Sequence, residues 1–209
     1  MNHRYHTIQG WSHHLEPLYD YLIPQLPPEA NIVEVGSWRG RSITYLQVEL
    51  INRGKSATIT AVDHWLGSDE EFYRNPEIEP LLGARIYEEF LRNIQGLNIQ
   101  HIRQPSLIAS ESFPDSTLDL VILDDAHDHE SVVQGIRAWY PCLRPGSIIA
   151  GDDCDEHYPG VRSAVTQEFG NHWQFLESST HQLHTPESSK NLAGSWIYQK
   201  PRSATIVAC

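Results

Sequence analysis

Acidic side chains follow two apolar segments that are typical of buried strands. Asp124 and Asp125 come directly after residues 118–123, and Asp152 and Asp153 come just after 147–150. Neighbouring parallel strands lie about 4.8 Å apart, so Asp124, Asp152 and Asp153 would converge and repel one another. A divalent cation removes that conflict, and carboxylate oxygens suit Mg²⁺, Mn²⁺ or Ca²⁺. The alternative is that these carboxylates cap helices or bind a cofactor without a metal.

Histidines lie beside both acidic pairs. His127 follows Asp124 by three residues, and His129 and His157 are also close in sequence to these pairs. Imidazole is a proton acceptor near physiological pH and a ligand for transition metals, so both roles stay open. Six other histidines show no ligand spacing and are expected at the surface: His3, His6, His13, His14, His181 and His184.

A glycine-containing turn follows the first apolar segment, 32–35. Gly36 and Gly40 are spaced G-x-x-x-G, which differs from the dinucleotide and nucleoside triphosphate patterns. Such a turn lets a ligand approach the main chain and opens a helix whose free N–H groups favour a carboxylate or phosphate. Asp63 ends the second apolar segment, where an acidic residue accepts hydrogen bonds from ribose hydroxyls. Together these features favour an adenosine-type ligand over an ordinary strand-to-helix turn.

Alternating strand and helix patterns position these residues. Strands are predicted at 32–35, 57–62, 98–102, 118–123, 147–150, 173–176 and 196–198, and helices at 41–51, 81–94, 129–143 and 161–169. This order predicts an α/β fold with a Rossmann-like, doubly wound and mostly parallel sheet, which binds ligands beyond the carboxyl ends of its strands. We expect an N-terminal helical cap over 1–30, the main domain over 31–200 and a C-terminal tail over 201–209.

Composition narrows the classes of partner. The chain has 209 residues and a net charge of −12, so we expect it to avoid nucleic acid and anionic membrane surfaces. Cys142, Cys154 and Cys209 form no C-x-x-C pair, which indicates free thiols in a reducing compartment. The chain starts without a signal-peptide pattern and has no apolar run of membrane-spanning length. A cytoplasmic protein is expected, and a homodimer stays open.

Two stretches resemble a known family. E-V-G-S-x-x-G-R-S at 34–42, followed by Ala61-Val62-Asp63, is similar to the first signatures of class I S-adenosylmethionine-dependent methyltransferases. Residues 123–132, LDDAHDHESV, resemble the I-D-G-D-H-x-Y-E-x-V segment of the small-molecule group that includes macrocin O-methyltransferase-like enzymes, known as family 24. Residues 139–153 and 159–165 continue this likeness, which covers about 30–200 and is specific for the superfamily rather than for any substrate.

The resemblance implies a seven-stranded sheet with an antiparallel last strand and an S-adenosylmethionine cofactor. Asp63 would hold the ribose with His64 beside it, while Ser106 would lie near the adenine and Asp125 at its edge. The methionine end and the rest of the cofactor site would be formed by Glu34, Gly36, Ser37, Gly40, Ser42 and Asp124. Catechol-type and macrocin-type relatives would also hold a metal, here at Asp124, Asp152 and Asp153.

The chain departs from the group at Ala126, where relatives have the second acidic residue of D-G-D. If that residue is their proton acceptor, another group must act here. Catechol-type relatives have a lysine base at the place of His127, so His127 is the first candidate and His157 the second. The leading hypothesis is therefore O-methylation of a small hydroxylated molecule. The alternatives are a metal-dependent hydrolase and a non-catalytic cofactor-binding module.

Overall fold

The computed structural model describes residues 5–10, 12–67 and 81–202. Its sheet has the strand order β3-β2-β1-β4-β5-β8-β6-β7. Strands β1 to β5 are parallel to their neighbours within that group, whereas β8 runs antiparallel to both β5 and β6. The order reverses direction at β1, where β2 lies on one side and β4 on the other, so ligands are expected at this edge.

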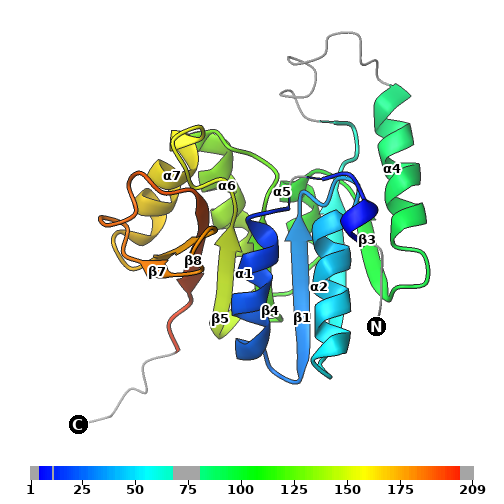
Figure 1. Cartoon of the computed structure of the whole chain (residues 1–209), viewed down its shortest axis with the longest axis horizontal. Coiled ribbons are helices and arrows are strands. Elements are labelled where there is room, and N and C mark those ends of the chain that lie inside the picture. Colours follow the sequence, from blue (N-terminus) through cyan, green and yellow to red (C-terminus); the bar gives the residue numbers. More distant parts are fainter. Residues whose placement is uncertain (1–4, 11, 68–80, 203–209) are drawn as a thin grey trace.

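The elements follow the chain in regular alternation (Figure 1). The strands are β1 Glu29–Val35, β2 Ser56–Asp63, β3 Ile99–Arg103, β4 Leu118–Leu123, β5 Leu143–Gly151, β6 Gln174–Glu177, β7 Leu183–His184 and β8 Gly194–Gln199. The helices are η1 Tyr5–Thr7, α1 Leu15–Leu22, η2 Ile23–Gln25, α2 Arg41–Asn52, α4 Leu81–Asn93, α5 Ser106–Ser110, α6 His129–Trp139 and α7 Pro159–Phe169.

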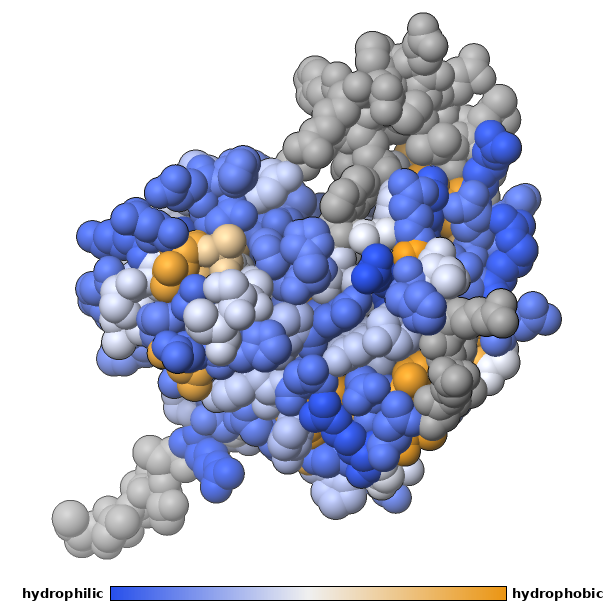
Figure 2. Space-filling view, viewed as in Figure 1, coloured by the Kyte–Doolittle hydropathy of each residue, from blue (hydrophilic) through white to orange (hydrophobic). Residues whose placement is uncertain are grey.

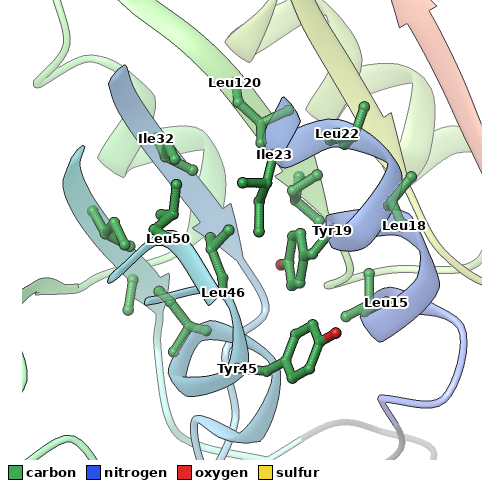
Figure 3. Packing of buried hydrophobic residues seen from close by; sticks show 14 of the residues in the cluster. Leu15, Leu18, Tyr19, Leu22, Ile23, Ile32, Tyr45, Leu46, Leu50 and Leu120 are labelled. Carbon is green, nitrogen blue, oxygen red and sulfur yellow. The ribbon is translucent and has the colours of Figure 1, made fainter. Parts of the chain in front are cut away.

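Two apolar layers sandwich the sheet, because successive strand residues point to opposite faces. Ile32 and Leu120 face one layer, which includes α1, α2 and α4, whereas Val33 and Val121 face the other, which includes α6 and α7. Helix α1 lies against the first face, and its four buried side chains contact α2 and the sheet (Figure 3): Leu15, Leu18, Tyr19 and Leu22. The helix expected in the N-terminal cap thus packs directly on the sheet.

The predicted Rossmann-like sheet with an antiparallel last strand is confirmed, but the strand count of seven was wrong. The additional strand is β7. It has only two residues, which is too few for an alternating pattern to be recognised. The helix expected at 129–143 ends at Trp139, because Leu143 already begins β5. Helix α5 was missed for a similar reason, since it has five residues. Residues 68–80 of the loop after β2 and 203–209 of the expected tail lie outside the described residues.

The face shown in Figure 2 is mostly hydrophilic, and its apolar side chains lie in small separate patches. Within the described residues, every helix is too short or too polar to cross a membrane.

Gly36 offers a direct test of how the sheet edge is built. Its φ is +90°, and an added Cβ would lie 2.1 Å from the Asp124 carbonyl oxygen. Gly36→Ala should therefore combine left-handed strain with a backbone overlap and lower the free energy of unfolding by roughly 3 kcal/mol or more. Urea denaturation measures this change.

The matched control is Gly54→Ala. Gly54 has φ +67° but open space around its Cβ position, so only strain of about 1–2 kcal/mol is expected. Equal losses in the two variants would show that the overlap at Asp124 adds nothing.

Candidate active site

The turn after β1 brings two strand ends together. The Gly36 N–H donates to the Val62 carbonyl of β2 at 2.9 Å, and the Asp124 N–H donates to the Val35 carbonyl at 2.9 Å. Gly40 has φ +83°, and a Cβ there would lie 2.9 Å from the Phe90 ring of α4. Both glycines therefore have a packing reason as well as the predicted ligand-binding one. Gly40 caps the N-terminus of α2, whose free N–H groups face this edge.

Asp63 connects the turns after β1 and β2. Its carboxylate accepts hydrogen bonds from the Trp38 N–H at 2.8 Å and the Trp65 N–H at 2.6 Å. Trp38 and Trp65 both have positive φ, and the Trp65 indole donates to the Trp38 carbonyl at 2.6 Å. Burial raises the pKa of Asp63, and these two N–H donors act against that rise. The carboxylate is thus fixed at the strand end where a ribose is expected.

Glu34 is fully buried in β1 among hydroxyl groups. The Tyr19 hydroxyl of α1 donates to its Oε2, and the Ser42 hydroxyl of α2 donates to its Oε1 at 3.0 Å. Burial raises the pKa of Glu34 to about 7, although these hydrogen bonds favour the ionised form. Ser37 is also buried, and its hydroxyl contacts the Glu34 carbonyl at 3.4 Å. The predicted Glu34, Ser37 and Ser42 therefore form one buried polar group beside the turn.

The structure brings Asp124, Asp152 and Asp153 together, as the strand order requires. Asp124 follows β4, and Asp152 and Asp153 follow its parallel neighbour β5. Burial raises the pKa of Asp124 well above its usual value, and the charges of Asp152 and Asp153 raise it further. The Asp124 carboxylate oxygen lies within 4.8 Å of ligand atoms of both His127 and Asp153. Asp153 has φ +54°, a conformation that aspartate tolerates better than most residues.

His14 was wrongly expected at the surface. Its side chain is only 15% exposed, and its Nδ1 lies 3.2 Å from Asp152 Oδ1. The hydrogen bond to Asp152 raises the pKa of His14 against the opposing effect of burial. Sequence spacing gave no signal for this pair because the two residues are 138 positions apart. The usable signal was the position of His14 immediately before the amphipathic helix α1.

The two proposed bases lie in different surroundings. His127 Nε2 is 2.8 Å from Asp153 Oδ2, and the His127 ring packs on Tyr158 with 4.3 Å between centroids. The His157 side chain is 87% exposed and lies 3.7 Å from Asp155. His129 contacts Ser163 and Gln167 of α7 instead of the carboxylates. The structure thus brings His127, but not His157 or His129, into the carboxylate cluster.

The expected adenine side is formed by the ends of β2, β3 and β4. Ser106 opens α5, accepts a hydrogen bond from the Trp139 indole at 3.1 Å and hydrogen-bonds to Asp125. The exposed His64 accepts a hydrogen bond from the Leu66 N–H at 2.9 Å. Asp63, Ser106 and Asp125 therefore surround one end of the sheet edge, with the carboxylate cluster at the other end.

Two sets of ligand atoms in the cluster are close enough to hold a cation. One set is His14, Asp152 and Asp153, and the other is Asp124, His127 and Asp153; within each set all atoms lie within 4.8 Å of one another. A small pocket opens here, lined by Asp124, Ala126, His127 and Asp152 among others. The turn side of this edge thus offers the Asp63 carboxylate and the N-terminus of α2, and the cluster offers carboxylate and imidazole atoms at a spacing that a cation could bridge.

Comparison with known proteins identifies one family. The family described as "methyltransferase domain", family 24, matches residues 33–154, which is more than half of the chain. The chain is also 28% identical over 169 residues to the uncharacterized protein y4gI of Sinorhizobium fredii, an alignment that covers 76% of this chain. The chain spans only 17% of the length of that curated relative.

Solved structures share the fold at low identity. The precorrin 8W decarboxylase of Methanobacterium thermoautotrophicum is 15% identical with a TM-score of 0.56, covering 92% of this chain and 93% of that one. An S-adenosylmethionine-dependent O-methyltransferase of Thermotoga maritima is 16% identical with a TM-score of 0.53, covering 89% and 65% of the two chains. At these identities the likeness shows the fold alone.

The pKa of Glu34 predicts a pH-dependent effect on stability. The unfolded chain ionises near pH 4.5 while the folded carboxyl ionises near pH 7, so Glu34 lowers stability increasingly as the pH rises between these values. Glu34→Gln removes this effect. The free energy of unfolding of Glu34→Gln relative to the wild type should therefore rise by roughly 3 kcal/mol from pH 4 to pH 8.

Urea denaturation across this pH range measures the difference. The matched control is Glu88→Gln on the exposed side of α4, which removes a carboxylate without disturbing the buried group. A Glu34→Gln difference that stays constant with pH would mean that the folded state does not hold this carboxyl protonated.

Proposed function

This chain belongs to the methyltransferase domain family and has the fold of the class I S-adenosylmethionine-dependent enzymes, and we propose that it methylates a hydroxyl oxygen of a small molecule with help from a divalent cation. The observation that carries the proposal is the pairing of two sites at one sheet edge. The Gly36 turn and Asp63 lie on one side, and Asp124, Asp152 and Asp153 lie on the other. The acceptor must be small enough to enter between them.

The cofactor side fits an adenosine-type ligand. The Asp63 carboxylate is held by two backbone N–H groups, which leaves further lone pairs for the ribose hydroxyls. Gly36, Ser37 and Gly40 bring the main chain and the N-terminus of α2 toward the methionine end, while Ser106 and Asp125 lie toward the adenine. When bound, S-adenosylmethionine supplies a sulfonium methyl group for transfer to the acceptor oxygen.

The carboxylates on the other side suit a divalent cation. Asp124 lies in a desolvated environment at the end of β4, and Asp152 and Asp153 add further negative charge beside it. Carboxylate oxygens at such spacing are ligands for hard cations, and a cation there would orient the hydroxyl of the acceptor. This charge distribution supports a metal-assisted reaction over one that relies on the cofactor alone.

His127 is the proposed proton acceptor. Its contact with Asp153 and its packing on Tyr158 fix the orientation of the ring at the pocket wall. A carboxylate beside an imidazole also stabilises the imidazolium that forms when the proton is taken. His127 would thereby take the place of the acidic side chain that is missing at position 126.

The cofactor assignment predicts the effect of Asp63→Asn. This variant removes the charged carboxylate that would accept the ribose hydrogen bonds. The binding free energy of S-adenosylmethionine should therefore weaken by about 1–3 kcal/mol. Isothermal titration calorimetry on the folded variants measures this loss. Asp128→Asn is the control, because Asp128 caps α6 through the Ser131 N–H and should leave the affinity unchanged. Equal affinities for the wild type and Asp63→Asn would contradict the assignment.

The base assignment predicts a loss of turnover in His127→Ala. Methyl transfer to a panel of hydroxylated small molecules should slow by roughly 10²–10⁴-fold in kcat, while S-adenosylmethionine affinity stays near the wild-type value. His157→Ala is the matched control and should keep normal turnover. The reverse pattern would assign the base to His157. A wild type that binds the cofactor but forms no methylated product would instead be a non-catalytic binding module.

A further inference from the structure

An N-terminal histidine reaches the carboxylates that end β5. His14 Nδ1 lies 3.2 Å from Asp152 Oδ1, and it forms a compact set of ligand atoms with Asp152 and Asp153. The Ser195 hydroxyl of β8 contacts the same Asp152 oxygen at 3.3 Å and the His14 carbonyl at 3.5 Å. His14 therefore lies at a point where the N-terminal segment, β5 and β8 meet.

The position of His14 is fixed by the core. It directly precedes α1, whose buried side chains pack on α2 and the sheet (Figure 3). Tyr19 of this helix also hydrogen-bonds to the buried Glu34. On the outer side, Arg41 of α2 pairs with Glu16 at 3.1 Å, and Ser12 donates to Glu16 at 2.8 Å. The imidazole thus lies beside the cluster at the start of a helix that is anchored in the core.

The atomic spacing fits a coordination sphere. Two ligands at right angles, each about 2.1 Å from a metal ion, lie about 3 Å apart. The separation of 3.2 Å between His14 Nδ1 and Asp152 Oδ1 is close to this value. Asp153 supplies a second carboxylate within the same set.

The negative charge of the carboxylate cluster exceeds the positive charge that neighbouring side chains provide. Asp124, Asp152 and Asp153 lie together, and Glu34 is buried nearby. Burial and the neighbouring charges of Asp152 and Asp153 both disfavour a negative charge on the Asp124 side chain. An ion bound by His14, Asp152 and Asp153 would lie beside it and offset that charge.

We propose that His14 is a metal ligand, which together with Asp152 and Asp153 makes the site selective for a first-row transition-metal ion such as Mn²⁺ or Co²⁺ over Mg²⁺. Imidazole nitrogen binds such ions well, whereas Mg²⁺ prefers oxygen ligands. This inference rests on the divalent cation of the proposed function and adds a ligand from the N-terminal segment. His127 remains the proton acceptor on the other side of Asp153.

Pulsed electron paramagnetic resonance of the full chain with Mn²⁺ tests the ligand directly. The wild type should show a directly coordinated ¹⁴N nucleus, and labelling with ¹⁵N-histidine should change that signal to the ¹⁵N pattern. His14→Gln keeps a donor for Asp152 but removes the imidazole. This variant should lose the nitrogen signal. Calorimetry should show that its Mn²⁺ affinity falls about tenfold or more, while its Mg²⁺ affinity changes less than about threefold.

The matched controls are His13→Gln and His127→Gln. His13 is exposed and packs edge-on against the His14 ring with 4.7 Å between centroids, so its loss should change neither signal nor affinity. Loss of the signal in His127→Gln but not in His14→Gln would overturn the proposal. The labelling experiment on the wild type shows whether a histidine binds the ion, and retention of the signal in His127→Gln then assigns it to His14 even if His14→Gln fails to fold.

Two further outcomes separate this inference from the proposed function. Mn²⁺ binding without any histidine nitrogen signal, with Mg²⁺ bound equally well, would overturn the role of His14 and leave a metal-assisted methyltransferase intact. Absence of binding of either ion at millimolar concentration would overturn both the metal in the proposed function and this inference.

Discussion

The convergence of buried carboxylates at one edge of the sheet is the constraint on which the site depends. Strands β2, β1, β4 and β5 are neighbours and parallel, so the acidic residues at their carboxyl ends meet there. Bringing such charges out of water and close together is costly unless each is compensated. Neighbouring side chains and backbone N–H groups reduce this cost at several of the carboxylates.

Each carboxylate is compensated in its own way. Glu34 has a raised pKa and lies among hydroxyl groups. Asp63 accepts hydrogen bonds from two backbone N–H groups in turns with positive φ. Asp152 pairs with His14 and Asp153 pairs with His127. Asp124 lies between these groups, where burial and the charges of Asp152 and Asp153 raise its pKa well above the usual value. The end of β4 is therefore the point at which a cation would relieve the most repulsion.

Local sequence patterns predict what depends on local structure. The runs of Ile, Val and Leu in β1, β2 and β4 identified the strands, and strand order then brought Asp124 together with Asp152 and Asp153. Contacts between distant segments were not predictable in this way. His14 acquires its environment from α1 packing on the sheet, and no spacing in the sequence encodes its distance from Asp152. The two-residue β7 was missed because its pairing with β6 is set by tertiary contacts.

The roles of the glycines were predicted only in part. Ligand binding was the expected reason for glycine at positions 36 and 40. The structure shows that atoms of the protein itself also fill the space beside both glycines. The Asp124 carbonyl occupies the place of a Cβ at Gly36, and Phe90 crowds the same place at Gly40. The turn and the end of β4 are therefore built as one unit, so a change at Gly36 would disturb the end of β4 at Asp124 as well as the turn itself.

The same electrostatics gives a physical reason for the change at Ala126. A second acidic residue there, as in the D-G-D segment of the relatives it resembles, would add another charge beside Asp124, Asp125 and Asp153. With alanine at 126, His127 is the basic group at a pocket wall that also includes Asp124, Asp125 and Asp152, and its contact with Asp153 offsets negative charge when the ring is protonated. Under the proposed assignment of His127, an imidazole in place of a carboxylate as proton acceptor would lower the repulsion in the cluster. Because the imidazole would gain a positive charge on taking the proton, Asp153 would stabilise the product of the proton transfer, a role it could not have beside another carboxylate.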